Sequence, residues 1–310
     1  MRTVRGWRDI SADDRGASVA FGAFDGVHRG HQQVIGAAAE AARTLGAPLG
    51  AVSFDPDPWR WFHPADPPFL LTTAAQRDRQ FAAIGVDRFH LLPFDREMAE
   101  LSAEAFAEEV LVRGLGVRHV AVGFDATFGK GRTGDPDMLR DLGRRFGFGV
   151  TEVPPVVDAA GRKLSSTAIR KALQVGDVRT AAAILGRPFA IEGVVVEGRK
   201  LGRELGFPTA NVLLGDYVRP QLGIYASRTL LPDGRLLPGV SSIGTNPTVG
   251  VVEARLETWL FDFDEDIYGQ TLETRLIDYL RPELKFDGLD SLVAQVMADA
   301  AEARRLLQND

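Results

Sequence analysis

The sequence predicts two domains: an α/β domain with a parallel sheet, then a mostly antiparallel β-barrel with a C-terminal helix. In the first half of the chain, short apolar segments alternate with helical patterns, which is typical of a parallel sheet. Beyond residue 188 the segments become short and β-branched and are separated by Gly, Pro and Asp turns, which indicates an antiparallel sheet or barrel. Residues 289–307 are Ala-rich and amphipathic, which predicts a helix. The Gly-Arg-Pro at 186–188 marks the boundary, so we expect domains 1–186 and 187–310.

Composition narrows the class of protein. With 310 residues, 45% hydrophobic and 25% charged, the chain has the composition of a soluble globular protein. The net charge of −6 disfavours a nucleic-acid partner, and no apolar run approaches membrane-spanning length, so we expect no membrane partner. The absence of cysteine excludes disulfides and thiolate catalysis and is compatible with the cytoplasm, where we expect the protein. Residues 1–10 do not resemble a signal peptide, and the sequence predicts no oligomeric state.

The elements follow from apolar runs and their terminators. Short, small, apolar runs suit the strands of a buried parallel sheet, and Gly46 and Gly114 suit helix stops. In the first domain we expect strands at 17–21, 49–54, 87–92, 117–122 and 149–153, and helices at 32–45, 73–84, 103–113 and 137–146. Residues 171–185 should form small helical pieces around Gly176 and Asp177. In the second we expect strands at 189–196, 222–230, 240–243, 254–261 and 271–280.

The strongest motif is GAFDGVHRGH at 22–31, between the first strand and the first helix. At such a turn, free N–H groups and the helix dipole can meet an anion. His28 and His31 are three residues apart and would share a helix face, while Gly30 lets a phosphate approach the backbone. Zinc ligation by the two histidines and a plain surface loop are the alternatives. The glycines and the strand–turn–helix context favour a phosphate site.

Two further loops follow strands of the first domain. Residues 55–58 (DPDP) precede a cluster of aromatic side chains, which is either core or the lining of a pocket for a flat ligand. In GFDATFGKG at 123–131, Asp125 can accept hydrogen bonds from a ribose or adenine and Phe128 can stack on a ring. The alternative for the second loop is a plain glycine-rich turn.

Ser-Ser-Thr at 165–167 would ordinarily be a helix cap. Arg170 favours a phosphate site instead, because it lies one helical turn past the cap, where its guanidinium can donate two hydrogen bonds to phosphate oxygens.

In the second domain, the glycines and basic residues of 198–206 suit a loop that covers phosphates, although the stretch lacks the Walker pattern. Thr209 and Asn211 could place two oxygens on Mg²⁺, or could be a turn residue and a local cap. Alternation puts Glu257 on one strand face with Trp259 and Phe261, either as an edge carboxylate or as a base.

These motifs together resemble a known family. GxFDGVHxGH resembles the signature of the bacterial bifunctional riboflavin kinase/FMN adenylyltransferases (FAD synthetases), within the nucleotidylyltransferase superfamily, and SSTxxR resembles the second superfamily motif. GFPTAN at 206–211, the Glu257 strand and DIYG at 266–269 are similar to the kinase half. The resemblance implies a Rossmann-like nucleotidylyltransferase domain followed by a riboflavin-kinase barrel. It covers nearly the whole chain.

The resemblance also implies the chemistry. The barrel would phosphorylate riboflavin with ATP to give FMN, and the first domain would adenylylate FMN with a second ATP to give FAD and pyrophosphate, with Mg²⁺ as cofactor. The catalytic residues would be Glu257, His28, His31 and Arg170, with Glu253 as a less favoured base. The nucleotides would be bound by Gly22, Phe24, Asp25, Gly30, Asp125, Ser165, Ser166, Thr167, Gly198, Lys200, Gly202, Thr209 and Asn211, the last two also holding the metal. The flavin would be bound by Phe54, Pro56, Asp57, Pro58, Phe62, Phe128 and Arg281.

Two positions depart from the family pattern: Asp57 stands where His is usual, and Ala126 where Phe is usual. One alternative is therefore an enzyme with a single activity, with the adenylyltransferase as the half more readily altered. Another is a flavin-binding regulator without turnover, which the joint retention of the phosphate-binding groups disfavours. A pantetheine phosphate substrate is disfavoured because it leaves the barrel unexplained.

Overall fold

The computed structural model describes the chain apart from residues 199–201, 203–204, 249–250 and 309–310. Its contacts divide it into two compact units. The first comprises Met1–Asp66 and Ala74–Leu164, and the second comprises Pro67–Thr73 and Ser165–Asp310. The helices after Leu164 thus group with the barrel by contacts, whereas the domain boundary at 186/187 stays a prediction.

The first unit is built on a six-stranded sheet in the order β1-β4-β3-β2-β5-β6. Every neighbouring pair is parallel, which confirms the predicted parallel sheet. The strands are β1 (Arg2–Arg5), β2 (Ser18–Phe21), β3 (Leu49–Asp55), β4 (Arg88–Pro93), β5 (His119–Gly123) and β6 (Gly149–Val153). Strand β1 was not predicted, because only Val4 of its four residues is buried and the segment carries almost no apolar pattern.

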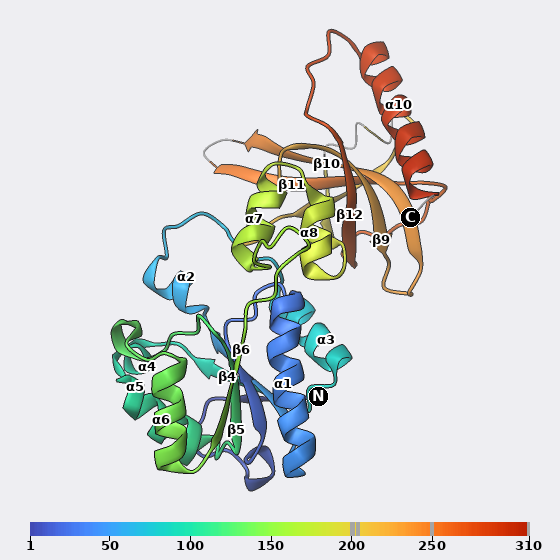
Figure 1. Ribbon diagram of the computed structural model, residues 1–310. Helices are drawn as coiled ribbons and strands as arrows, with labels where there is room; N and C mark the ends of the chain where they lie inside the picture. Colours follow the sequence, from blue (N-terminus) through green and yellow to red (C-terminus); the bar gives the residue numbers. More distant parts are fainter. Residues whose placement is uncertain (199–201, 203–204, 249–250, 309–310) are drawn as a thin grey trace. The chain divides into compact units, whose positions relative to one another are not determined.

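Helices cover both faces of this sheet (Figure 1). They are α1 (Arg29–Leu45), α2 (Pro58–Phe62), α3 (Ala74–Ile84), α4 (Arg96–Glu100), α5 (Ala103–Ala105), the π-helix η2 (Phe106–Gly114) and α6 (Pro136–Phe146), with short 3₁₀ turns η1 (Ala12–Asp14) and η3 (Lys130–Arg132). One core packs α1 and α3 on the face that carries Ala20, and the other packs η2 and α6 on the face that carries Val19 and Phe21. This double burial explains why β2 is apolar throughout.

His90 of β4 is the one histidine buried completely among the described residues, and neither ring nitrogen has a hydrogen-bond partner there. Burial lowers the pKa of His90 to about 4; Asp14 opposes this shift, and Arg88 adds to it. The imidazole is therefore held neutral in the folded protein at pH values where an unfolded chain would protonate it.

We expect this histidine to make the fold acid-sensitive. Above pH 6.5 the ring is neutral in both states, so its stabilising contribution is intact. Between pH 6.5 and the lowered pKa of about 4 only the unfolded chain gains the proton, so the free energy of unfolding falls, by about 3 kcal/mol at pH 4. Urea unfolding from pH 4 to pH 8 measures this, and His90→Leu should flatten the slope. Equal slopes for the two proteins would contradict the assignment.

The second unit contains a closed barrel in the order β10-β11-β8-β7-β12-β9, as expected (Figure 1). All its strand pairs are antiparallel. The elements are α7 (Ser166–Gln174), α8 (Val178–Leu185), β7 (Phe189–Val196), β8 (Thr209–Leu213), β9 (Gly223–Leu230), β10 (Leu236–Thr248), β11 (Val251–Leu260), β12 (Thr271–Arg281) and α10 (Leu289–Leu307). Leu256, Thr258 and Leu260 of β11 are buried, which leaves Glu257 on the opposite face.

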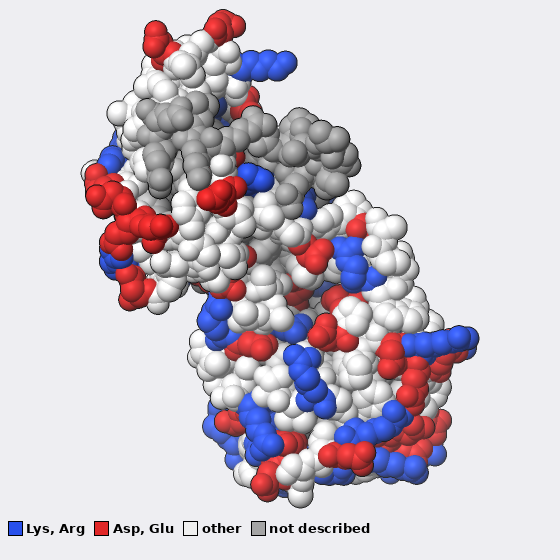
Figure 2. Space-filling view, turned by 180° about the vertical axis from the view of Figure 1, so that it is seen from behind, with Lys and Arg blue, Asp and Glu red and all other residues white. Residues whose placement is uncertain are grey.

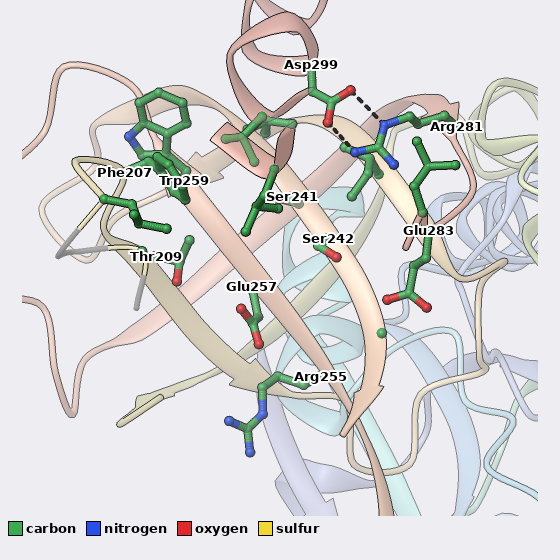
Figure 3. A pocket seen from close by; sticks show the side chains of 18 of the residues that line it. Phe207, Thr209, Ser241, Ser242, Arg255, Glu257, Trp259, Arg281, Glu283 and Asp299 are labelled. Atoms are coloured by element: carbon green, nitrogen blue, oxygen red, sulfur yellow. Dashed lines mark hydrogen bonds and ion pairs between the residues drawn. The ribbon is translucent and has the colours of Figure 1, made fainter. Parts of the chain in front are cut away.

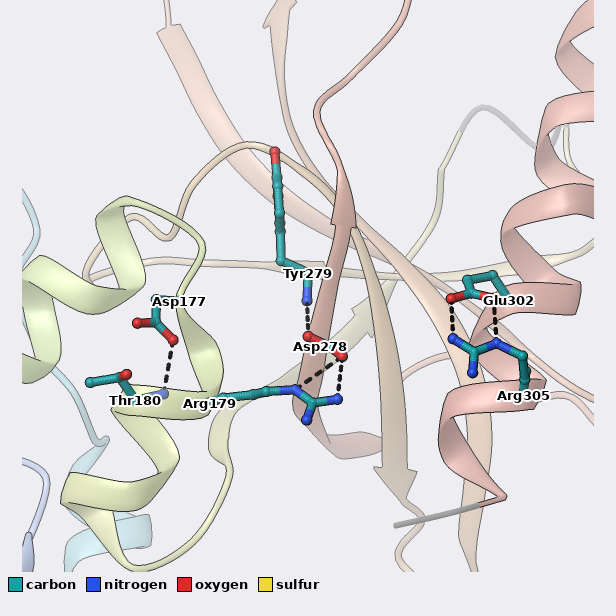
Figure 4. Close-up of polar contacts among 7 residues, drawn as sticks. All are labelled: Asp177, Arg179, Thr180, Asp278, Tyr279, Glu302 and Arg305. Atoms are coloured by element: carbon teal, nitrogen blue, oxygen red, sulfur yellow. Dashed lines mark hydrogen bonds and ion pairs between the residues drawn. The ribbon is translucent and has the colours of Figure 1, made fainter.

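Helices pack on the outside of this barrel. Ala300, Ala303 and Leu307 of α10 form one cluster with barrel residues that include Val240 and Phe261. Near β12, Asp177 caps α8 through the N–H of Thr180 at 2.9 Å, and Arg179 bonds Asp278 with Nη2 2.5 Å from Oδ2 (Figure 4). The amphipathic C-terminal helix predicted at 289–307 is confirmed, with the same bounds.

Charged side chains of both signs are interspersed on the face shown in Figure 2. The first unit contains exposed ion pairs, such as Arg140 with Glu152 at 2.9 Å and Arg145 with Glu104 at 2.6 Å. Such pairs add little stability individually. Within the described ranges, no helix combines the length and the apolar character needed to cross a membrane.

Candidate active sites

The predicted phosphate turn connects β2 to α1. Its backbone enters the left-handed region at Phe24, Gly26 and Val27, with φ of 57°, 86° and 41°. This region disfavours a β-branched residue such as Val27, so the turn is strained. Full burial of Val27 and a hydrogen bond from Gln32 Nε2 to the Val27 carbonyl at 3.0 Å hold it in place. Strain that the surroundings enforce in this way is common at functional sites.

The two histidines lie together at the start of α1, which begins three residues earlier than the sequence predicted. His28 is the N-cap, and its Nδ1 accepts from the N–H of His31 at 3.3 Å. When the ring is neutral, this bond places its proton on Nε2. The rings of His28 and His31 stack with centroids 3.6 Å apart, and His31 also meets Phe24 edge-on at 5.3 Å. His28 is only 5% exposed, so its orientation is fixed by packing.

Gly30 has a packing reason as well as the predicted one. A Cβ at this position would come within 3.0 Å of His28 Cε1 and 3.4 Å of the Leu164 carbonyl oxygen. Any larger residue would therefore push the His28 ring out of its place over the helix N-terminus.

Strands β2 and β5 are neighbours in the sheet although β3 and β4 lie between them in the chain, so the strand order reverses here. Ligands of doubly wound sheets bind at this point, beyond the carboxyl ends of the strands. Gly22 and Asp25 follow β2, and the loop at 123–131 follows β5. The topology of the first unit thus brings two of the predicted stretches to one edge of the sheet.

The predicted site residues of these loops differ in burial. Asp25 is buried, whereas Asp125 is exposed and forms an ion pair with Lys163, with Nζ 2.5 Å from Oδ2. Phe128 is only 6% exposed and packs in the core against Phe106, with ring centroids 5.8 Å apart. Its predicted contact with a flavin stays a prediction.

The loop after β3 leads into α2, which the sequence analysis missed. Asp57 is its N-cap and accepts from the N–H of Trp59 at 2.8 Å, and Pro58 occupies the first turn. Asp57, which departs from the family pattern, therefore caps a helix. The Asp-Pro pair in the sequence is a typical helix start and could have predicted α2. Phe62 is 56% exposed on α2, while Phe54 meets Phe94 edge-on at 5.3 Å. Pro56 lies at the start of this exposed loop.

The second predicted phosphate motif begins α7, in the second unit. Ser165 is the N-cap and accepts from the N–H of Ala168 at 3.2 Å; Ser166 and the exposed Thr167 follow in the first turn. Arg170 donates from Nε to the Phe69 carbonyl at 2.8 Å and lies 5.2 Å from the centre of the Phe69 ring. These contacts fix one edge of the guanidinium.

The barrel carries a pocket of about 430 Å³ on the outer face of β8, β10 and β11, bordered by α10 (Figure 3). Strand register determines which side chains meet there. Glu257 lies directly opposite Asn211 of β8 and Ser242 of β10, and Trp259 lies opposite Thr209. The pocket therefore places a carboxylate beside the two predicted metal-binding side chains, on one face of the sheet.

Asn211 is 5% exposed, and its amide nitrogen donates to the Thr209 carbonyl at 3.2 Å, which leaves the amide oxygen to bind a cation. A Cβ on Gly198 would come within 2.5 Å of that amide, so only glycine fits there. The hydroxyl of Thr209 and the amide oxygen of Asn211 are hard donors, which fit Mg²⁺. Lys200 lies outside the described residues, as does the side chain of Glu253, and Gly202 borders the pocket.

Arg281 lines the pocket, and its guanidinium is paired with a carboxylate of the protein. It forms a bidentate ion pair with Asp299 of α10, with Nε 2.9 Å from Oδ1 and Nη2 2.6 Å from Oδ2 (Figure 3). Sequence reasoning missed Asp299, Glu283, Ser242 and Arg255, which also line the pocket. Only Arg255 and Ser242 had a usable signal, since both lie on strands near the predicted base.

No group of three or more His, Cys, Asp or Glu side chains in the described part of the chain is arranged to hold a metal ion. His28 and His31 therefore have no third protein ligand of these types there.

A doubly wound α/β unit followed by a barrel with a carboxylate beside two hard oxygen donors defines a two-domain transferase acting on phosphate groups. Comparison with known proteins refines this class. Residues 10–168 match the FAD synthetase family, and residues 185–307 match the riboflavin kinase family. The chain belongs to the family of bifunctional riboflavin kinases/FMN adenylyltransferases.

Relatives span the whole chain. The bifunctional riboflavin kinase/FMN adenylyltransferase of Escherichia coli (strain K12) is 40% identical over 305 residues, covering 98% of this chain and 97% of that protein. The protein of the same name from Pseudomonas fluorescens is 42% identical over 307 residues, covering 99% and 98%. A crystal structure solved under the name macrolide-efflux protein from Streptococcus pneumoniae is 34% identical, with a TM-score of 0.87, and covers 97% of this chain and 98% of that one.

Proposed function

We propose that the barrel phosphorylates riboflavin with ATP to give FMN, and that the α/β unit adenylylates FMN with a second ATP to give FAD and pyrophosphate. Membership of the family supports both activities. The observation that carries the kinase half is the position of Glu257 directly opposite Asn211 in the pocket.

In the kinase reaction, Glu257 takes the proton of the terminal ribityl hydroxyl as its oxygen attacks the γ-phosphoryl of ATP. Phosphoryl transfer depends mainly on positioning and charge stabilisation, so few protein groups need to react. Thr209 and Asn211 would hold Mg²⁺, which supplies charge neutralisation at the phosphates when it is bound. The rings of Trp259 and Phe207 pack against each other at a tilt, with centroids 5.8 Å apart, and both line the pocket.

In the adenylyl transfer, the FMN phosphate is already a nucleophile and needs no base. His28 and His31 donate to the ATP phosphates as negative charge grows during the displacement. Ser165, Ser166 and Arg170 keep the role that the resemblance gives them, which is to bind the leaving pyrophosphate. Since both reactions consume ATP and the chain has no cysteine, we place the enzyme in the cytoplasm.

Incubating the purified protein with riboflavin, ATP and Mg²⁺ and separating the flavins by chromatography tests this function. We expect FMN to rise first and FAD to follow, and neither product to form without ATP. If FMN accumulates and no FAD forms, the protein has only the kinase activity. If FAD forms from supplied FMN but riboflavin is not converted, it has only the adenylyltransferase activity. Tight flavin binding without turnover would indicate a regulator.

A further inference from the structure

Arg255 is a cation in the kinase pocket to which no role has been assigned above. It lies two residues before Glu257 on β11, so the two side chains share one face of the strand. Its cross-strand neighbours are Leu213 of β8 and Gly244 of β10, neither of which offers a charge. Figure 3 shows Arg255 next to Glu257 at the edge of the pocket.

The state of this guanidinium differs from that of Arg281 in the same pocket. Arg281 is neutralised by Asp299 at 2.6 Å. In the part of the chain that the structure describes, Arg255 forms no ion pair, and its buried Nε has no hydrogen-bond partner. A guanidinium stays charged at any physiological pH, and a buried N–H without a partner is costly. This N–H would be satisfied by an acceptor on a molecule bound in the pocket.

Other arginines of this barrel differ from Arg255 in position and in pairing. Arg235 bonds Asp233 and Glu265, Arg275 bonds Glu273, and Arg304 bonds Asp262. Each lies outside the pocket and has a carboxylate partner. Arg255 shares neither property, which argues against a purely structural role.

We propose that Arg255 binds the phosphoryl group transferred in the kinase reaction; this rests on the function proposed above for the same pocket. Residues i and i+2 of a strand are about 6.8 Å apart, so the guanidinium can reach oxygens of a phosphoryl group whose attacking hydroxyl contacts Glu257. In that step the hydroxyl proton passes to Glu257, the new oxygen–phosphorus bond forms, and the bond to the leaving ADP oxygen breaks. Arg255 exchanges no atom and stabilises charge on the equatorial oxygens.

The test compares Arg255→Gln, Arg255→Lys and the control Arg235→Gln in the full-length protein. We expect Arg255→Gln to lower kcat for FMN formation about 100-fold, with the KM for riboflavin within twofold of the wild type. Arg255→Lys should recover part of the loss, since lysine restores the charge but cannot donate two parallel hydrogen bonds to phosphate oxygens. FAD formation from supplied FMN should stay unchanged in all three, and a melting temperature equal to that of the wild type shows that the barrel of each variant folds.

Arg255→Gln with kcat and KM for ATP within twofold of the Arg235→Gln control would overturn the inference. So would a loss in Arg255→Gln that comes with a matching fall in thermal stability and no recovery in Arg255→Lys. Glu257→Gln, assayed in parallel, separates the two proposals: if it is inactive while Arg255→Gln is active, only this inference fails. If Glu257→Gln makes FMN at the full rate, the proposed kinase site fails and this inference with it.

Discussion

Glu257→Gln is expected to lower the rate of FMN formation from riboflavin by 10²–10⁴-fold, about the contribution of a positioned general base. Glutamine keeps the size of the side chain and cannot take the proton. Because the change lies in the barrel pocket, the adenylylation of supplied FMN should proceed at the wild-type rate. Chromatographic assays of the two half-reactions on one protein sample measure both results.

Two other carboxylates provide the matched controls. Glu283 lines the same pocket but does not lie opposite Asn211, and Glu253 was the less favoured base in the sequence. We expect Glu283→Gln and Glu253→Gln to keep FMN formation within tenfold of the wild type. If either of them is inactive while Glu257→Gln is active, the base is wrongly assigned.

His31→Ala is expected to have the opposite selectivity. It should leave FMN formation intact and lower FAD formation about 10²–10³-fold, which corresponds to about 2.7–4 kcal/mol for one preorganised donor. The variant also removes the ring that stacks on His28 at 3.6 Å, so the effect includes loss of His28 orientation. Steady-state rates of FAD and pyrophosphate release with supplied FMN measure it.

Gln33→Ala is the control for this variant, since Gln33 is exposed on the same helix. It should retain both activities. Equal loss of FMN and FAD formation in folded His31→Ala protein would show that the two chemistries do not have separate sites.

Five of the six strands of the parallel sheet, β2 to β6, could be predicted, because strands buried on both faces are short, continuous apolar runs. Strand β8 could not be, because Thr209 and Asn211 lie in a glycine-rich string with a proline and give no apolar pattern. The start of α1 was placed too late, since histidine at the N-cap is not a usual capping signal.

In the candidate site, too, local patterns could be predicted and contacts between distant segments could not. Alternation along β11 placed Glu257 on the correct face, but its neighbour Asn211 depends on the register between β11 and β8, which no local pattern encodes. Asp299 and Arg281 come from different elements, so their ion pair could not be foreseen. The packing of Phe128 in the core could not be foreseen either, because an aromatic residue in a loop gives no sign of its burial.

The central claim is that the two reactions use two separate ATP sites, one at the turn that carries His28 and His31 and the other in the barrel pocket. A crystal structure with a non-hydrolysable ATP analogue and Mg²⁺ tests it most directly. We expect one analogue with its phosphates at the turn that carries His28 and His31, and a second with its phosphates and Mg²⁺ at Thr209 and Asn211. A single analogue bound per chain at saturating concentration, or phosphates located away from these residues, would contradict it.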